Sequence, residues 1–345
     1  MKKQIRLLLT SSKTLINLGR LESLKNNQKY DFYIVGVDAL ADGFKLPLLD
    51  EQIKVPLGTD QSYSDKILKI VKKKKIDVII PASDHEVYAI SKHEEMFEEI
   101  GTAVVCSSFE SVAKAVNKAS MLNFLKEKHV ATPRYVVPTS ADNFIKSAKK
   151  LGYPKKMLVV KPASLSGNRG VWYLKEDFSG QLLSVRNISY ITLEGFTNQL
   201  RKITPFPSLV LMEYLTGEEY SVDGLAQNGK PIYILPRVRV SPLPGQSQEA
   251  LIKKNDEVYK YVAAICKVFR LNSIFNVQLK YDEDNKPKVY EINPRVSATA
   301  SANEAAGIDL VLFSILQALG KPFPKNLHFH KVRMIRFWKE FYTDK

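Results

Sequence analysis

The first third of the chain alternates between two kinds of apolar pattern. Residues 5–10, 32–37 and 76–81 are short, almost continuously apolar runs that are typical of buried strands. Residues 13–26 and 64–75 instead carry their apolar side chains at helical spacing. Strands that alternate with helices in this way predict a parallel sheet with both faces covered. This part of the chain therefore reads as an α/β domain.

A strand, a turn and a second strand are predicted between residues 276 and 292, where Asp284-Asn285 and Pro287 supply the turn chemistry. Antiparallel pairing across this turn would bring Gln278 close to Glu291, with Asn293 and Arg295 just beyond. Oxygen ligands beside a guanidinium suit Mg²⁺ and the phosphates that it carries. A surface hairpin with a solvated, charged tip is the alternative interpretation of this segment.

The residues around this hairpin resemble a known signature. Glu291-Ile-Asn293-Pro-Arg295, preceded by Asn276-Val-Gln278, is similar to the metal-binding motif of the ATP-grasp superfamily, especially in the large subunit of carbamoyl phosphate synthetase. The resemblance implies that Gln278 and Glu291 hold one Mg²⁺ (or Mn²⁺). It also implies that Glu291 and Asn293 hold a second, and that Arg295 touches the transferring phosphate of ATP.

The resemblance also implies an architecture. Residues 1–112 resemble the Rossmann-like α/β domain that precedes the ATP-grasp domain in this family, and residues 113–325 resemble the ATP-grasp domain itself. The second part would be two-lobed, with a small lid lobe at about 135–214 and a metal-binding lobe at about 215–325. The expected fold class is therefore α/β, with α+β character in the ATP-binding part. The remainder, from residue 326 to 345, is expected to be a basic C-terminal tail.

Other positions match residues that contact the nucleotide in the family. Lys118 begins a helix where many ATP-grasp proteins have an Asp-Lys pair, but Asn117 replaces the acid here. Lys161 ends an apolar strand, and the SLSGNRG loop after it resembles the mobile lid. The segment after residue 212 resembles the hinge between the two lobes, where Glu213 and Leu215 would border the adenine. Glu219 would accept hydrogen bonds from the ribose hydroxyls, unless it lies in a solvated turn. The complete set implied for ATP is Lys118, Lys161, Ser166, Gly167, Arg169, Glu213, Tyr214, Leu215 and Glu219.

Two arginines share one phase of a strand predicted over residues 231–240, because Arg237 and Arg239 are two positions apart. Together with Arg295 they are the expected catalytic residues, and they suit bidentate capture of a carboxylate or an acyl phosphate. Solvated arginines are the alternative. Residues 241–248 lack periodicity and are expected to form a loop of the acceptor pocket.

Some acidic residues allow two interpretations. Asp84, with Ser83, either caps a helix or contacts substrate, and Glu86 is a further substrate candidate. Asp223 either forms a structural ion pair or acts as a ligand.

Further along the chain, residues 302–319 are expected to form one long helix with an apolar core stripe.

Composition narrows the classes of function. The chain has 345 residues with a net charge of +15, and no apolar run approaches the ~20 residues that a membrane span needs. Its lysines are scattered except for Lys72–Lys75 at a predicted helix end, which disfavours nucleic acid as a main partner. A larger anionic acceptor substrate is left open. Cys106 and Cys266 lie among apolar neighbours and are expected to be buried thiols in a reducing compartment.

Taken with the resemblance, the sequence predicts a cytoplasmic, Mg²⁺- and ATP-dependent ligase. It would activate a small carboxylate as an acyl phosphate and join it to an amine, without a protein nucleophile. One alternative is a synthase that forms carbamoyl or carboxy phosphate from bicarbonate. The other is a non-catalytic ATP-binding regulatory protein or a basic polyanion binder. The substrates are not identified, and a homodimer is left open.

Overall fold

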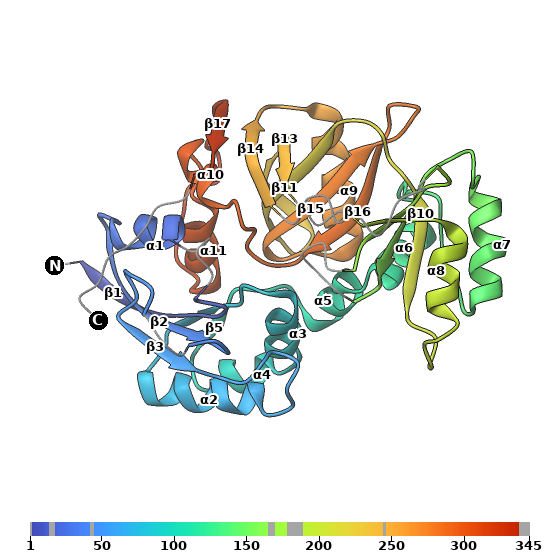
Figure 1. Ribbon diagram of the computed structural model, residues 1–345. Helices are drawn as coiled ribbons and strands as arrows, with labels where there is room; N and C mark the ends of the chain where they lie inside the picture. The colour runs from blue at the N-terminus through green and yellow to red at the C-terminus, as the bar shows by residue number, and fades with distance from the viewer. Residues whose placement is uncertain are drawn as a thin grey trace.

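The computed structural model describes residues 2–13, 18–41, 45–164, 170–177, 189–243 and 246–337. In this part of the chain the strands form three sheets, one at the N-terminus and two in the remainder (Figure 1). The N-terminal sheet is parallel throughout, and the other two are mainly antiparallel. The expected α/β class with α+β character in the second part is therefore confirmed.

The N-terminal sheet has the strand order β3-β2-β1-β4-β5. Its central strand, β1, pairs with β2 on one side and β4 on the other, which aligns Leu7 with Ile34 and with Val78. Helices cover both faces of this sheet, so apolar side chains on either side of its inner strands are removed from water. The elements are β1 (Lys3–Leu9), α1 (Leu18–Lys25), β2 (Tyr30–Asp38), β3 (Glu51–Lys54), α2 (Tyr63–Lys74), β4 (Val78–Ile80), α3 (Asp84–Lys92), α4 (Glu94–Glu98) and β5 (Ala103–Val104).

Two helices connect this domain to a small sheet of order β6-β10-β7-β8-β9. They meet at Asn117, whose side chain caps the second helix by accepting a hydrogen bond from Ser120 N, and the helix predicted to begin at Lys118 is confirmed. The elements are α5 (Phe109–Val116), α6 (Lys118–Glu127), β6 (Tyr135–Val136), α7 (Ala141–Leu151), β7 (Leu158–Pro162), β8 (Trp172–Leu174), β9 (Ser189–Ile191), α8 (Leu193–Leu200) and β10 (Leu209–Glu213).

The large sheet has the order β16-β15-β11-β13-β14-β17, with β12 paired to β11. The predicted strand-turn-strand is confirmed as β15 and β16, which pair antiparallel. The elements are β11 (Glu219–Gln227), β12 (Lys230–Leu235), β13 (Arg237–Leu243), β14 (Gln246–Ile252), α9 (Asp256–Phe269), β15 (Ser273–Tyr281), β16 (Pro287–Asn293), α10 (Ser301–Ala305), α11 (Leu310–Ala318) and β17 (Val332–Ile335).

Two predictions in the 231–248 region are wrong. The single strand over 231–240 is divided at Pro236 into β12 and β13, since proline has no N–H to continue a ladder. Much of the loop expected at 241–248 instead lies in strands, because β13 continues to Leu243 and β14 begins at Gln246. Proline 242 lies within β13, where its backbone pairs with Ser247 at a register shift.

The single helix predicted over 302–319 is also wrong. Gly307 adopts a φ of +94°, which ends α10 and lets the chain turn before α11 begins. Its N–H donates to the Glu304 carbonyl at 2.8 Å, and Ile308 N–H donates to the Asn303 carbonyl at 2.9 Å. The segment expected as a tail contributes β17, which pairs antiparallel with β14.

One apolar core is shared between the N-terminal domain and the large sheet. Leu7 and Ile80 from the parallel sheet lie in the same buried cluster as Leu235, Ile308 and Phe313. Helix α11 lies between the two sheets and covers a face of each (Figure 1). The core role predicted for the apolar stripe is therefore confirmed for Ile315 on α11 and for Ile308 just before it, which are fully buried; Leu312 and Leu319 are partly buried.

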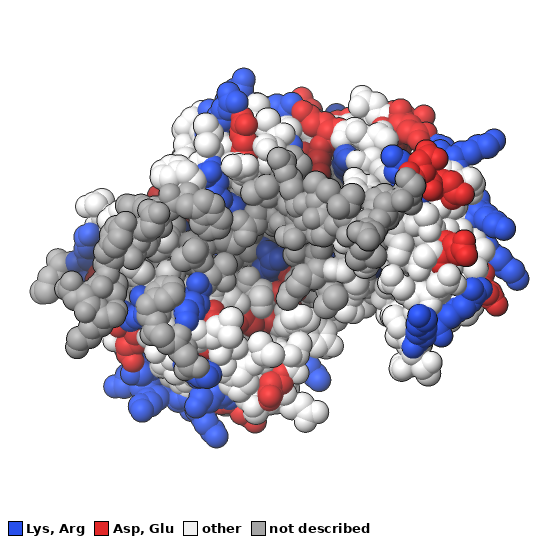
Figure 2. Space-filling view, viewed as in Figure 1, with Lys and Arg blue, Asp and Glu red and all other residues white. Residues whose placement is uncertain are grey.

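One group of exposed lysines lies over α2 at one edge of the N-terminal domain, and other basic side chains are spread over the rest of this face (Figure 2). The group consists of Lys66, Lys69, Lys72, Lys73 and Lys75. Both cysteines are buried free thiols, as predicted, and burial raises the pKa of each. Among the residues that the structure describes, no helix is long and apolar enough to cross a membrane.

Gly224 in β11 has no room for a side chain. A Cβ there would lie 2.2 Å from Phe275 Cζ and 2.8 Å from the Tyr233 carbonyl oxygen. We expect Gly224→Ala to lower the free energy of unfolding by about 3 kcal/mol, because a fully buried ring and a backbone atom must move. Urea denaturation of the whole chain, followed by circular dichroism, measures this.

Gly101→Ala is the matched control. Its Cβ would meet nothing within 4 Å, but its φ is +76°. It should therefore cost only backbone strain, about 1 kcal/mol. Equal losses for the two variants would contradict the steric explanation.

Candidate functional site

The predicted oxygen ligands meet on the β15–β16 hairpin. The strand register places Gln278 opposite Glu291 and Asn276 opposite Asn293, as antiparallel pairing required. Asn276, Gln278 and Glu291 line a cavity of about 80 Å³, together with Arg295. The cluster contains one carboxylate and several amides, and the described residues hold no group of three or more His, Cys, Asp or Glu that could bind a metal. A cation here would therefore rely on amide and phosphate oxygens as well.

Arg295 is held at three points. Its Nη2 donates to Asn293 Oδ1 at 2.9 Å, and its Nη1 donates to the Val296 carbonyl at 3.1 Å. Its Nε donates to Asp84 Oδ1 at 2.9 Å, and this ion pair joins the hairpin region to α3 of the N-terminal domain. The guanidinium is thus fixed beside the predicted metal ligands.

Lys161, at the end of β7, enters the site from the small sheet. Its Nζ lies 4.1 Å from the centre of the Tyr290 ring. Burial lowers the pKa of this ammonium to about 8; the charge of Glu291 opposes the shift, and Lys118 adds to it. Lys118 is itself buried, and its backbone N–H donates to the Ala163 carbonyl at 2.8 Å. The two lysines predicted for the nucleotide therefore lie close enough to affect one another.

Tyr290 is a member of the site that the sequence did not indicate. A register shift after Gln278 leaves Tyr290 as an extra residue between Val289 and Glu291. Its hydroxyl donates to Glu219 Oε1 at 2.7 Å and contacts Gln278 Oε1 at 3.2 Å. Bulges often redirect a side chain beside a functional site. The bulge depends on pairing with the other strand, so no local sequence pattern reveals it.

Arg237 and Arg239 both lie on one side of β13, but their surroundings differ. Arg239 pairs with Glu219 and lines the cavity with the hairpin residues. The side chain of Arg237 is 1% exposed, and its Nη2 donates to Asp223 Oδ2 at 2.9 Å. The alternative of solvated arginines is therefore wrong for both. The structural ion pair considered for Asp223 is present, while catalytic roles for the two arginines stay predictions.

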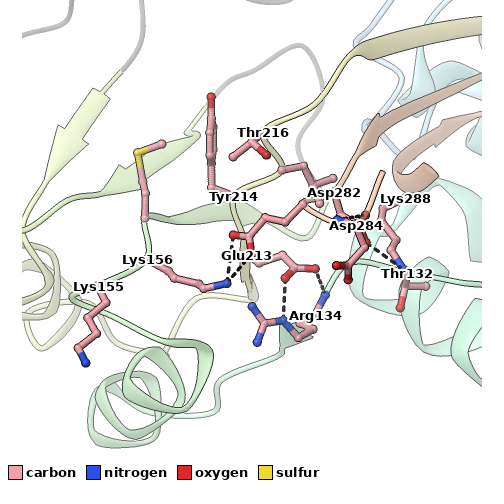
Figure 3. Close-up of a pocket in the computed structure, with 13 residues that line it drawn as sticks. Thr132, Arg134, Lys155, Lys156, Glu213, Tyr214, Thr216, Asp282, Asp284 and Lys288 are labelled. Carbon is pink, nitrogen blue, oxygen red and sulfur yellow. Dashed lines mark hydrogen bonds and ion pairs between the residues drawn. The ribbon is translucent and has the colours of Figure 1, made fainter. Parts of the chain in front are cut away.

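The predicted hinge lies between the small sheet and the large one (Figure 3). Glu213, the last residue of β10, accepts hydrogen bonds from Arg134 N at 2.8 Å and Arg134 Nε at 2.7 Å. Tyr214 and Leu215 continue the chain beside a cavity of about 700 Å³. The carboxylate of Glu213 is thus engaged by Arg134, and only its backbone is left as the expected adenine contact.

The remaining predicted residues divide into two groups. Ser166, Gly167 and Arg169, expected in the lid, lie outside the described residues. Ser83 caps α3 by accepting from Glu86 N, which confirms the capping interpretation. Glu86 is 6% exposed and accepts from Thr10 Oγ1 at 2.6 Å, so it is part of a buried polar network.

Arg20 is a second residue that the sequence did not indicate. It is buried, and its Nη2 donates to the Ser297 carbonyl, directly after the hairpin motif. Burial and then the charge of Arg295 lower the pKa of Arg20 to about 9. A lone arginine in an N-terminal helix carries no pattern that distinguishes it from a surface residue.

Comparison with known proteins finds one family model for each of two segments of the chain. Residues 205–339 match a family model described as "ATP-grasp in the biosynthetic pathway with Ter operon". Residues 7–105 match one described as "PylC-like, N-terminal domain". The carbamoyl phosphate synthase large chain of Clostridium acetobutylicum is 22% identical over 271 residues, which are 75% of this chain and 24% of that protein. The chain spans no more than about a quarter of the length of such curated relatives.

Solved structures resemble nearly the whole chain. N5-carboxyaminoimidazole synthetase from Staphylococcus aureus, complexed with ADP, has a TM-score of 0.73 and 16% identity, and the match covers 98% of this chain and 83% of that one. An L-amino acid ligase from Bacillus licheniformis has a TM-score of 0.64 and 16% identity, covering 92% and 75%. These similarities concern the fold, while the two family models concern the sequence. The chain therefore carries a domain that matches an ATP-grasp family model, over residues 205–339, behind one that matches a PylC-like N-terminal domain, over residues 7–105.

Proposed function

We propose that this protein is an ATP-dependent ligase that activates a substrate carboxylate as an acyl phosphate and joins it to an amine. The observation that carries the proposal is the register of β15 and β16, which puts Gln278 directly opposite Glu291. Arg295 and Lys161 bring positive charge to the same place. Oxygen ligands and cations gathered at one point suit a nucleotide triphosphate and its metal.

The residues present fit Mg²⁺. Magnesium is usually held by one or two carboxylates plus substrate phosphates, and the cluster offers the Glu291 carboxylate with the Gln278 and Asn293 amides. Gln278 and Glu291 would hold one ion, and Glu291 and Asn293 a second. When bound, the metal offsets negative charge on the transferring phosphate.

The chain's own residues would orient the nucleotide. Lys161 and Lys118 supply charge for the phosphates, and Arg295 would lie at the phosphate that transfers. Arg239, which pairs with Glu219 in this structure, lies where a carboxylate or acyl phosphate could bind. The backbone of Glu213, Tyr214 and Leu215 would border the adenine, as the fold position of the hinge suggests.

The proposed reaction balances without a protein nucleophile. A substrate carboxylate oxygen attacks the γ-phosphorus of ATP, the bond to the β-phosphate oxygen breaks, and ADP leaves. The amine then attacks the carbonyl carbon of the acyl phosphate, inorganic phosphate leaves with the bonding electrons, and the amine loses a proton. We propose that residues 1–112 and 113–325 form the domains of this enzyme and that it acts in the cytoplasm on small molecules.

A second candidate function is formation of carboxy or carbamoyl phosphate from bicarbonate. The observation that favours it is the similarity of 75% of this chain to a carbamoyl phosphate synthase large chain. Bicarbonate-dependent ADP release in the absence of any amine or other carboxylate would distinguish it from the ligase.

Replacing Glu291 with Gln tests the proposed site. The variant keeps the shape of the side chain but removes the only carboxylate of the proposed metal ligands. We expect ADP release to fall by about 100-fold or more, since even residues behind a metal ligand often contribute 10- to 100-fold. The assay is Mg²⁺-dependent ADP release with pools of amino acids, small carboxylates or bicarbonate.

Glu110→Gln is the matched control, the same change of carboxylate to amide away from the site. Glu110 is exposed on α5, where it pairs with Lys114 at 2.7 Å, and an exposed pair contributes little to stability. This variant should release ADP at the wild-type rate. Unchanged ADP release by Glu291→Gln would refute the assigned ligand set.

The lowered pKa of Lys161 predicts a pH effect on nucleotide binding. Since this pKa is about 8 in the folded protein, the ammonium loses its proton as the pH rises from 7 to 9. ATP affinity should therefore fall over this range, by up to about tenfold at one pH unit above the pKa. Isothermal titration calorimetry with Mg²⁺-ATP at each pH measures the affinity.

Lys161→Arg should flatten this pH profile, because arginine stays protonated throughout the range. The same slope in the wild type and in Lys161→Arg would show that another group titrates.

A further inference from the structure

Two side chains of the N-terminal domain reach the motif that carries the predicted metal ligands. Asp84, the first residue of α3, contacts the Arg295 side chain across 211 residues of sequence. Arg20, from α1, contacts the Ser297 carbonyl two residues further on. Helix α1 packs closely enough that a Cβ on Gly19 would lie 3.0 Å from Ser301 Cβ. The N-terminal domain is therefore in direct contact with this motif.

The Asp84–Arg295 pair is well shielded from water. The two side chains are 12% and 17% exposed, and Nε lies 2.9 Å from Oδ1. The other two guanidinium nitrogens donate to Val296 O and to Asn293 Oδ1, so the plane of the group is defined by three contacts. Asp84 supplies the one carboxylate in this arrangement.

Asp84 is itself held in place. The Ser83 side chain caps α3, and its hydroxyl donates to Glu86 Oε2 at 2.8 Å. Glu86 also accepts from Thr10 Oγ1 at 2.6 Å and from Ser11 N at 3.1 Å, at the end of β1. This buried network fixes the start of α3 to the carboxyl ends of β1 and β4. The Asp84 carboxylate is thus presented from a rigid frame rather than from a loop.

A role in the N-terminal domain alone does not account for Asp84. An acidic residue in the first turn stabilises a helix wherever its carboxylate points, and Ser83 already provides the cap. The direction of the Asp84 carboxylate, toward a guanidinium on another domain, is an additional property. Since a buried arginine without its partner is costly, the pair restricts where Arg295 can point.

We propose that Asp84 is a positioning residue for Arg295, so that the N-terminal domain completes the phosphate site. The inference rests on the proposed function, in which Arg295 lies at the phosphate that transfers. Asp84 holds the guanidinium through Nε, while Nη2 donates to Asn293 Oδ1 and Nη1 to the Val296 carbonyl, and the arginine held in this way lines the cavity. It touches no reacting atom itself and acts through the arginine.

The test compares the affinities of the whole chain for Mg²⁺-ATP and Mg²⁺-ADP. Only ATP carries the γ-phosphate, so a misplaced Arg295 should weaken ATP binding and leave ADP binding unchanged. We expect Asp84→Asn, which keeps the shape but removes the charge, to weaken ATP binding about tenfold and ADP binding less than twofold. Calorimetric titration measures both affinities, and thermal unfolding shows whether each variant is folded.

Arg295→Lys should reduce the preference for ATP to a similar extent, because lysine has no Nε–H for Asp84. In the Arg295→Lys background, Asp84→Asn should then have no further effect, since the two residues act as a unit. Asp84→Ser, which keeps a hydrogen-bonding side chain at the start of the helix, is the second variant if Asp84→Asn does not fold.

Ser107→Ala is the matched control, because it weakens a different contact between the N-terminal domain and the rest of the chain. Ser107 also links the N-terminal domain to the large sheet, through Asn272 O at 2.7 Å and Asn272 N at 2.8 Å, but it lies away from Arg295. It should leave both affinities unchanged. Equal weakening of ATP and ADP by Asp84→Asn, no weakening at all, or additive effects in the double variant would each overturn the proposal. A wild-type chain that does not bind ATP would instead refute the proposed function itself.

Discussion

A buried ion pair on β11 and β13, the strands that follow the β15–β16 hairpin in the large sheet, constrains the whole site. Arg237 and Asp223 are almost completely removed from water, so the remaining oxygen of Asp223 needs further donors. Asn276 Nδ2 donates to Asp223 Oδ1 at 2.8 Å, which directs Asn276 Oδ1 toward Asn293. Asn293 Nδ2 donates to that oxygen at 3.3 Å, and so its own Oδ1 faces Arg295.

These contacts form one continuous polar chain from the core of the large sheet to the N-terminal domain. It runs through Arg237, Asp223, Asn276, Asn293, Arg295 and Asp84. Each amide can satisfy its neighbours in only one orientation, because its oxygen accepts and its nitrogen donates. The orientation of Asn293, a proposed metal ligand, is thereby set by a charge in the core that no nucleotide would touch. Side chains that look like independent motif positions therefore behave as one network.

The sequence predicted the local parts of this arrangement well and the long-range parts poorly. The hairpin was predicted because its turn residues and the spacing of Gln278, Glu291 and Asn293 are all local. Antiparallel pairing of the two strands then predicted that Gln278 and Glu291 face one another. The bulge that places Tyr290 against Glu219 and Gln278 depends on two strands together, and the contact between Asp84 and Arg295 depends on how two domains pack. Neither leaves a periodic signal. The divisions at Pro236 and Gly307 did leave one, since proline and glycine mark breaks, but the flanking apolar pattern concealed them.

The core shared through α11 joins the two parts of the chain that the sequence analysis divides near residue 112. Leu7 and Ile80 on one side and Ile308 and Phe313 on the other exclude water from the same interior. The two family models match separate segments of this chain, residues 205–339 and 7–105, but these segments share an interior and should lose their structure together. Consider a chimera in which the first domain is replaced by that of a relative. Its α10 and α11, which lie near the other end of the chain, would have to be exchanged together with that domain.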